Sequence, residues 1–182
     1  MEKMDDATLD ELKSLVFKTD LKYLKALYLH GNGEMRLSKI TEFLPVLLSV
    51  TTRQIFIDSF ILEKSDLELL LTHSHKSKNL TLVNWEIGEL KDRLEIKENK
   101  EEYKLQELDL YWTAIENNPK YLDRPKMEIL LKSLNELKIK DTLSAIHIWE
   151  TDFNKTYLEK LIRDLDLAFT VQADKEQPKP FM

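Results

Sequence analysis

Histidine is the residue type best suited to metal binding or to acid–base catalysis at neutral pH, and this 182-residue chain has four. His73 and His75 are two residues apart on a predicted helix and would point in different directions, whereas a metal-binding pair on a helix needs a spacing of four residues. His30 and His147 occupy related positions in two repeated segments, but the strands that carry them would stand ~19 Å apart. The histidines therefore predict no metal site.

Acidic side chains gather near the start of the chain, at Asp5, Asp6, Asp10 and Glu11. Such a cluster could hold a cation, but acidic residues are also favoured at a helix N-terminus, where they interact with the helix dipole. Thr8 and Glu11 have the spacing of a capping box, in which each side chain bonds a free backbone amide. We therefore interpret the cluster as the start of a helix.

Glycine and nucleophile patterns give no sign of a reaction. The chain has only three glycines, so neither a Walker loop nor a dinucleotide-binding fingerprint is present. No local pattern sets a serine or threonine beside a histidine and an orienting acid. The sequence predicts a protein without a catalytic site, cofactor or metal.

The composition limits the classes of partner and compartment. The net charge is −6 and basic and acidic residues alternate along most of the chain, so we expect neither a concentrated basic stripe nor nucleic-acid binding. The absence of cysteine fits a reducing compartment. The acidic N-terminus does not resemble a signal peptide, and no apolar run is long enough for a membrane span. We expect a cytoplasmic protein, with a nuclear location as the alternative, and no membrane partner.

The elements that would position any functional side chain are internal repeats. Residues 105–115 and 143–153 share one frame of apolar anchors, and residues 24–32 form a third copy. Weaker copies surround residues 55–57 and 80–82. Each copy has the alternating pattern of a strand, and most are followed by apolar residues at helical spacing.

The repeats predict strands that alternate with helices. Strands are expected at 24–29, 55–57, 80–87, 105–115 and 165–171, with one more around Ile146; helices are expected at 9–16, 37–47, 65–71, 88–104, 127–134 and 158–162. Ser65 and Glu68 resemble a second capping box, and Pro45 means that its helix is kinked or starts late. The regular spacing of the earlier repeats would instead place a strand at 137–139, but the fuller match favours Ile146.

These repeats resemble those of leucine-rich repeat proteins, in the ribonuclease-inhibitor-like class with one helix in each unit. The family motif, L-x-x-L-x-L-x-x-N-x-L, is complete at Leu24, Leu27, Leu29 and Asn32. Phe60 and Trp85 replace the motif's asparagine, which predicts irregular turns there. The resemblance implies an α/β solenoid with a parallel sheet on its concave face and helices on its convex face. With five to six repeats in 20–172, we interpret the amphipathic helix expected in 1–19 as a cap on the first repeat, and we expect a flexible tail in 173–182 from its polar, proline-containing composition.

Side chains that alternate with the apolar anchors should line the concave face in parallel columns. This predicted partner-binding face consists of Tyr28, His30, Phe56, Asp58, Asp109, Tyr111, Trp112, His147 and Trp149. Tyr111 and Trp149 should lie on neighbouring strands and form one exposed apolar patch. A loop, the tail or a register slip of one residue could instead cover these aromatics.

The leading hypothesis is a non-catalytic protein–protein interaction module, acting as an adaptor or as a subunit of a larger assembly, because members of the resembled family mostly bind other proteins. The alternative is an α/β enzyme with an open doubly wound sheet, in which polar residues converge at the carboxyl ends of the strands. Its site would include Asn32, Asp58, Thr113 and Glu150. Helices on one face of the sheet or on both would distinguish these architectures.

Overall fold

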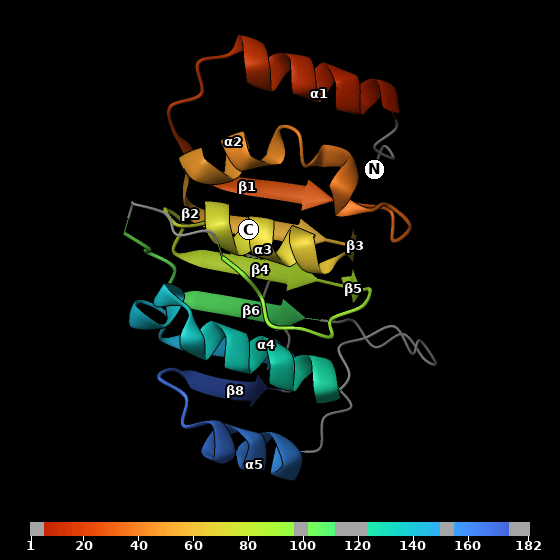
Figure 1. Cartoon of the computed structure of the whole chain (residues 1–182). Helices are drawn as coiled ribbons and strands as arrows, with labels where there is room; N and C mark the ends of the chain where they lie inside the picture. The colour runs from red at the N-terminus through yellow and green to blue at the C-terminus, as the bar shows by residue number, and fades with distance from the viewer. Residues whose placement is uncertain (1–5, 97–101, 112–123, 150–154, 175–182) are drawn as a thin grey trace.

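The chain folds as an α/β protein around one parallel sheet. We describe it from a computed structural model, which covers residues 6–96, 102–111, 124–149 and 155–174. Six strands lie side by side in the order in which they occur along the chain (Figure 1). They are β1 (Leu24–His30), β2 (Thr51–Asp58), β4 (Asn79–Val83), β6 (Glu107–Tyr111), β7 (Ala145–Trp149) and β8 (Thr170–Asp174). Every neighbouring pair is parallel.

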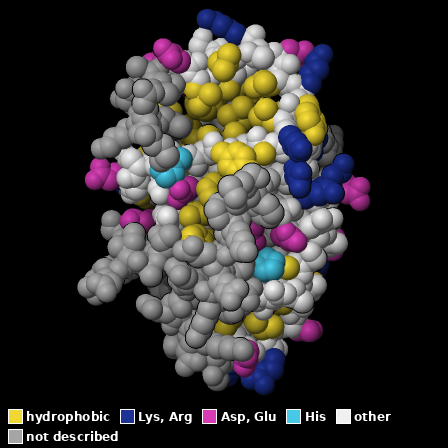
Figure 2. Space-filling model, turned by 180° about the vertical axis from the view of Figure 1, so that it is seen from behind, with side chains coloured by type: hydrophobic (Ala, Val, Ile, Leu, Met, Phe, Trp, Pro, Cys, Tyr) yellow, Lys and Arg dark blue, Asp and Glu magenta, His cyan; other side chains and the backbone are white. Residues whose placement is uncertain are grey.

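The helices connect these strands. They are α1 (Asp6–Lys18), α2 (Leu44–Val50), α3 (Lys64–His73), α4 (Arg124–Glu136) and α5 (Lys155–Leu165), with short 3-10 helices η1 (Leu37–Ile40) and η2 (Lys138–Asp141). Helices α2, α3 and α4 lie on the same face of the sheet, while α1 and α5 lie beyond β1 and β8 at its two ends (Figure 1). We call the opposite face of the sheet, which is seen in Figure 2, the back face.

The strand register follows the apolar anchors of the repeats. Leu27 pairs with Ile55, Ile55 with Leu80, Leu80 with Leu108, and Leu108 with Ile146. These anchors are buried on the helical side of the sheet. The preferred strand around Ile146 is confirmed, and residues 137–139 instead lead into η2.

The helix expected over 88–104 is wrong for the residues that the structure describes. Residues 88–96 run as an irregular segment that is hydrogen-bonded to side chains of α3 and α4. The backbone amide of Leu94 donates to the Ser133 hydroxyl, and that of Glu95 donates to Glu68. These amides bond side chains of neighbouring units instead of their own segment, while Leu94 is buried.

Two predicted caps are also misplaced. Helix α1 begins at Asp6, so Thr8 lies inside it and not at its cap. Helix α3 is capped by Glu63, whose side chain accepts from the third helical residue, Asp66, while Asp66 accepts from the Glu63 amide. Burial raises the pKa of Asp66, and this hydrogen bond partly offsets the rise. Helix α2 begins at Leu44 with Pro45 in its first turn, which confirms a late start.

The turns after the first strands are held by backbone hydrogen bonds and aromatic packing. Gly31 donates its amide to Asp58, Ser59 donates to Val83, and Asn84 donates to Tyr111, which extends the sheet ladder by one step. Phe60 and Trp85 are almost fully buried. A second, two-stranded sheet follows them, formed by β3 (Ile61–Leu62) and β5 (Glu86–Ile87). Large apolar side chains thus occupy the position where the repeat motif has asparagine.

Among the described residues, no helix combines the length and the apolar character that crossing a bilayer needs.

Candidate functional site: the back face of the sheet

Three rows of residues run across the strands at the back face, because paired residues of neighbouring strands occupy equivalent positions in the sheet. The Ala26 row is Ala26, Gln54, Asn79, Glu107 and Ala145; the Tyr28 row is Tyr28, Phe56, Thr81, Asp109 and His147; the His30 row is His30, Asp58, Val83, Tyr111 and Trp149. The predicted columns are therefore real neighbours across the sheet. Eight of the nine predicted site residues belong to the Tyr28 and His30 rows; the ninth, Trp112, lies outside the described residues.

The aromatic pair at the start of the Tyr28 row is accessible. The rings of Tyr28 and Phe56 lie 5.8 Å apart between centroids, with an interplanar angle of 40°. Tyr28 is 61% exposed, and its hydroxyl donates to Gln54 at 3.3 Å. Tyr23, just before β1, is 64% exposed. Figure 2 shows hydrophobic side chains gathered over this part of the back face.

The middle of the Tyr28 row is polar, and its threonine and aspartate are hydrogen-bonded to each other. The Thr81 hydroxyl donates to Asp109 at 3.0 Å, and the Asp109 carboxyl faces His147 on the next strand. Burial raises the pKa of Asp109; the hydrogen bond from Thr81 and the charge of His147 act in the opposite direction. The carboxyl lies between the hydroxyl and the imidazole, so the histidine is not placed to take a proton from Thr81. The trio lacks the order of a nucleophilic triad.

The His30 row begins with an ion pair on β1 and β2. His30 Nδ1 lies 2.6 Å from Asp58 Oδ2, and the other oxygen of Asp58 accepts from the Ser59 hydroxyl at 2.8 Å. The His30 side chain is 48% exposed and that of Asp58 is 16% exposed. The carboxylate orients the imidazole, and the exposed side of the ring is accessible to a partner.

The aromatic end of the His30 row differs from the prediction. Tyr111 pairs with Trp149 on the next strand, so their adjacency is confirmed. Tyr111 is only 8% exposed, however, and Val83 beside it is buried as well. The expectation of an exposed patch is therefore wrong for Tyr111, while the Trp149 side chain lies outside what the structure describes.

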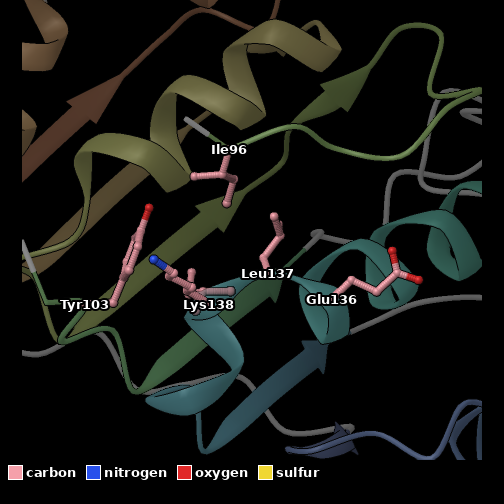
Figure 3. A pocket seen from close by; sticks show the side chains of 6 residues that line it. Ile96, Tyr103, Glu136, Leu137 and Lys138 are labelled. Carbon is pink, nitrogen blue, oxygen red and sulfur yellow. The ribbon is translucent and has the colours of Figure 1, made fainter. Parts of the chain in front are cut away.

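A small cavity lies on the helical side, apart from all of the predicted residues. It has a volume of about 180 Å³ and is lined by Ile96, Tyr103, Glu136, Leu137, Lys138 and Ile139 (Figure 3). The Tyr103 hydroxyl and the Lys138 amino group lie on one side, with Ile96 and Leu137 across from them (Figure 3). Burial raises the pKa of Tyr103, so its hydroxyl stays protonated at neutral pH. The Glu136 carboxylate points away from the cavity and pairs with Arg93.

Sequence reasoning missed this cavity because it placed Tyr103 in a solvated helix. The only signal was the presence of Ile96 and Tyr103 in an otherwise charged run. The cavity can surround a small apolar group, and the polar atoms that face it are the Tyr103 hydroxyl and the Lys138 amino group.

The features that the enzyme alternative requires are not present in the described part of the chain. The sheet order shows no reversal, so there is no crevice between diverging connections at the strand ends. Asn32 accepts from the Glu34 amide, while Thr113 and Glu150 lie outside the described residues. No group of three or more His, Asp or Glu side chains within the described ranges is placed to hold a metal ion.

Comparisons with models of protein families, with curated proteins and with solved structures found no match to this chain.

Proposed function

We propose that the chain is a leucine-rich-repeat-like solenoid that binds a protein partner on the back face of its sheet, as an adaptor or as a subunit of a larger assembly. It performs no catalysis of its own in this proposal. The sequential parallel strands and the helices α2, α3 and α4 on a single face support a repeat architecture.

The exposed ring of Tyr28, packed against the partly buried Phe56, is the observation that carries the proposal. Aromatic side chains supply most of the binding energy in many protein interfaces, because they bury a large area at a low cost in conformational entropy. This pair is flanked by polar groups that can form an interface rim. We therefore centre the binding surface on β1 and β2, and not on Tyr111 and Trp149.

Co-purification from the native cell tests this proposal. The tagged wild-type chain should recover a partner in a stoichiometric amount, and Tyr28→Ala should reduce the recovery by about tenfold or more. Phe17→Ala is the matched control, because Phe17 is a similarly exposed aromatic on α1. A wild-type chain recovered only as a free monomer would count against the proposal, as would an equal loss of partner with Phe17→Ala.

A further inference from the structure

Three basic side chains line the edge of the sheet where the first strands begin. Lys25, Arg53 and Lys78 each lie two residues before the first buried anchor of β1, β2 and β4. The Lys78 amide donates to the Arg53 carbonyl at 3.1 Å, so these two residues are direct neighbours across the sheet. Figure 2 shows Lys and Arg side chains along one edge of the back face, beside the hydrophobic group. We call these three residues the basic edge.

The sheet is irregular at the place where Lys25 and Arg53 meet. Leu24 pairs with Thr51 and Ala26 pairs with Gln54, so Lys25 alone lies opposite two residues, Thr52 and Arg53. Such a bulge changes the direction of side chains and bends the edge of a sheet. It leaves two basic residues close to each other on adjacent strands at this edge.

No described residue compensates this charge. None of the three side chains forms an ion pair or donates a hydrogen bond to a described side chain or backbone carbonyl, although all three are exposed. Other basic residues of the chain do find carboxylates: Lys13 pairs with Glu42, and Arg36 pairs with Glu63. The chain is acidic, with a net charge of −6, yet none of its described carboxylates pairs with this edge. Exposed basic side chains without an internal partner can pair with an acidic ligand.

We propose that the basic edge receives an acidic segment of the protein partner, whose apolar side chains contact Tyr28 and Phe56. This inference rests on the proposed function and adds the chemical class of the partner. Neighbouring strands are ~4.8 Å apart, so the three basic residues lie along a short line across three strands. An extended peptide with acidic residues at consecutive or alternate positions has carboxylates at a comparable spacing. Gln54 follows Arg53 in β2, and its side chain accepts a hydrogen bond from the Tyr28 hydroxyl, which links this edge to the exposed ring.

A peptide is favoured over a nucleic acid by the amount of charge. Three cations neutralise few phosphates, and the acidic remainder of the chain would repel a polyanion that extends beyond the edge. A short acidic segment places its charge only at the basic edge. Its aromatic or aliphatic residues can also pack against Tyr28, which a phosphate backbone would leave exposed to solvent.

Fluorescence anisotropy with defined probes tests this assignment. The probes are three fluorescein-labelled twelve-residue peptides that share one tryptophan and two leucines and carry glutamate, glutamine or lysine at the remaining positions. The glutamate peptide should bind best, with an affinity that falls as salt is added, and the lysine peptide should not bind. Replacing all three residues of the basic edge with glutamine should weaken the glutamate peptide about tenfold, the sum of three surface ion pairs.

A charge-matched control separates a local effect from the change in net charge. Lys140, Lys160 and Arg163 are exposed on η2 and α5, and their replacement with glutamine should leave binding of the glutamate peptide unchanged. Equal binding of the glutamate peptide to the basic-edge variant and to the wild type would overturn the inference. Tighter binding of a labelled oligouridine of twelve nucleotides than of the glutamate peptide would overturn it in favour of nucleic acid.

The failure of this inference can be told from the failure of the proposed function. If the native partner is retained by the basic-edge variant but lost by Tyr28→Ala, the partner binds on the back face without an acidic segment. If neither variant affects recovery of the partner, the back face is not the binding surface.

Discussion

Two tyrosines of the back face, Tyr28 and Tyr111, should respond very differently to truncation. Tyr111 is 8% exposed and Tyr28 is 61% exposed. Truncating a buried tyrosine to alanine removes roughly 150 Å² of buried area, which is worth about 3 to 4 kcal/mol at ~25 cal/mol per Å². For Tyr28 the buried share is less than half as large, and we expect a loss of about 1 kcal/mol, which includes the contact with Phe56.

Urea unfolding followed by far-UV circular dichroism measures both losses. With a urea dependence of about 2 kcal/mol per M, Tyr111→Ala should lower the midpoint by about 1.5 M and Tyr28→Ala by about 0.5 M. Tyrosine-to-phenylalanine variants at both positions separate the contribution of the hydroxyl from that of the ring. A Tyr111→Ala chain no less stable than Tyr28→Ala would mean that Tyr111 is accessible in the folded chain, and the binding surface would then extend to β6.

Three other substitutions test contacts on which the fold depends. Gly31→Ala should reduce the free energy of unfolding by about 2 kcal/mol and so lower the melting temperature, because a Cβ at Gly31 would lie 2.3 Å from the Ser59 carbonyl oxygen. An unchanged melting temperature would show that Gly31 and the Ser59 carbonyl are farther apart than this. Asp109→Asn should raise the free energy of unfolding at pH 7 by about 1 kcal/mol, because the raised pKa of Asp109 makes its ionisation oppose folding. In urea titrations this gain should vanish below the ordinary aspartate pKa of 3.8. A gain that stays constant with pH would refute the explanation. Ser133→Ala should cost about 1 to 3 kcal/mol and speed hydrogen exchange at the Leu94 amide, which would lose its buried acceptor; unchanged exchange there would contradict the contact.

The regular part of the fold was predictable because each strand repeats one pattern. The anchors Leu27, Ile55, Leu80, Leu108 and Ile146 were identified from their spacing, and they align across the sheet. Residues 88–104 could not be predicted in the same way. Their charged composition is that of a helix, but the acceptors for the Leu94 and Glu95 amides come from side chains far away in the sequence, Ser133 and Glu68. Local propensity carries no information about such partners.

The exposure of the back face was only half predictable. Alternation along a strand tells on which side of the sheet a residue lies, and it correctly put Tyr28, Phe56 and Tyr111 on the side away from the anchors. It does not tell how much of that side is accessible to solvent, which depends on the neighbouring rows and connections. Tyr28 and Tyr111 have the same residue type and the same side, yet they differ in exposure by a large factor.

The basic edge had a signal in the sequence that a search for charge runs overlooks. Lys25, Arg53 and Lys78 are 28 and 25 residues apart, the same intervals that separate Leu27, Ile55 and Leu80. The corresponding residues of the next two strands are Gln106 and Ser144, so the pattern ends after β4. In a chain built of repeats, residues that lie a whole repeat apart become neighbours across the sheet. Charge must therefore be compared at the repeat interval and not only along consecutive residues.

The hydrogen bonds of the back face divide it into a part that is already satisfied and a part that is not. Asn79 is bonded to Glu107, and Thr81 is bonded to Asp109, so a partner that used these side chains would first have to replace existing bonds. At the first strands the Tyr28 ring is exposed, and no described carboxylate pairs with the cations of the basic edge. Contacts formed there bury apolar area and pair charges without breaking internal bonds. The free energy available for recognition is therefore concentrated at the first strands of the sheet, although the back face continues across all six.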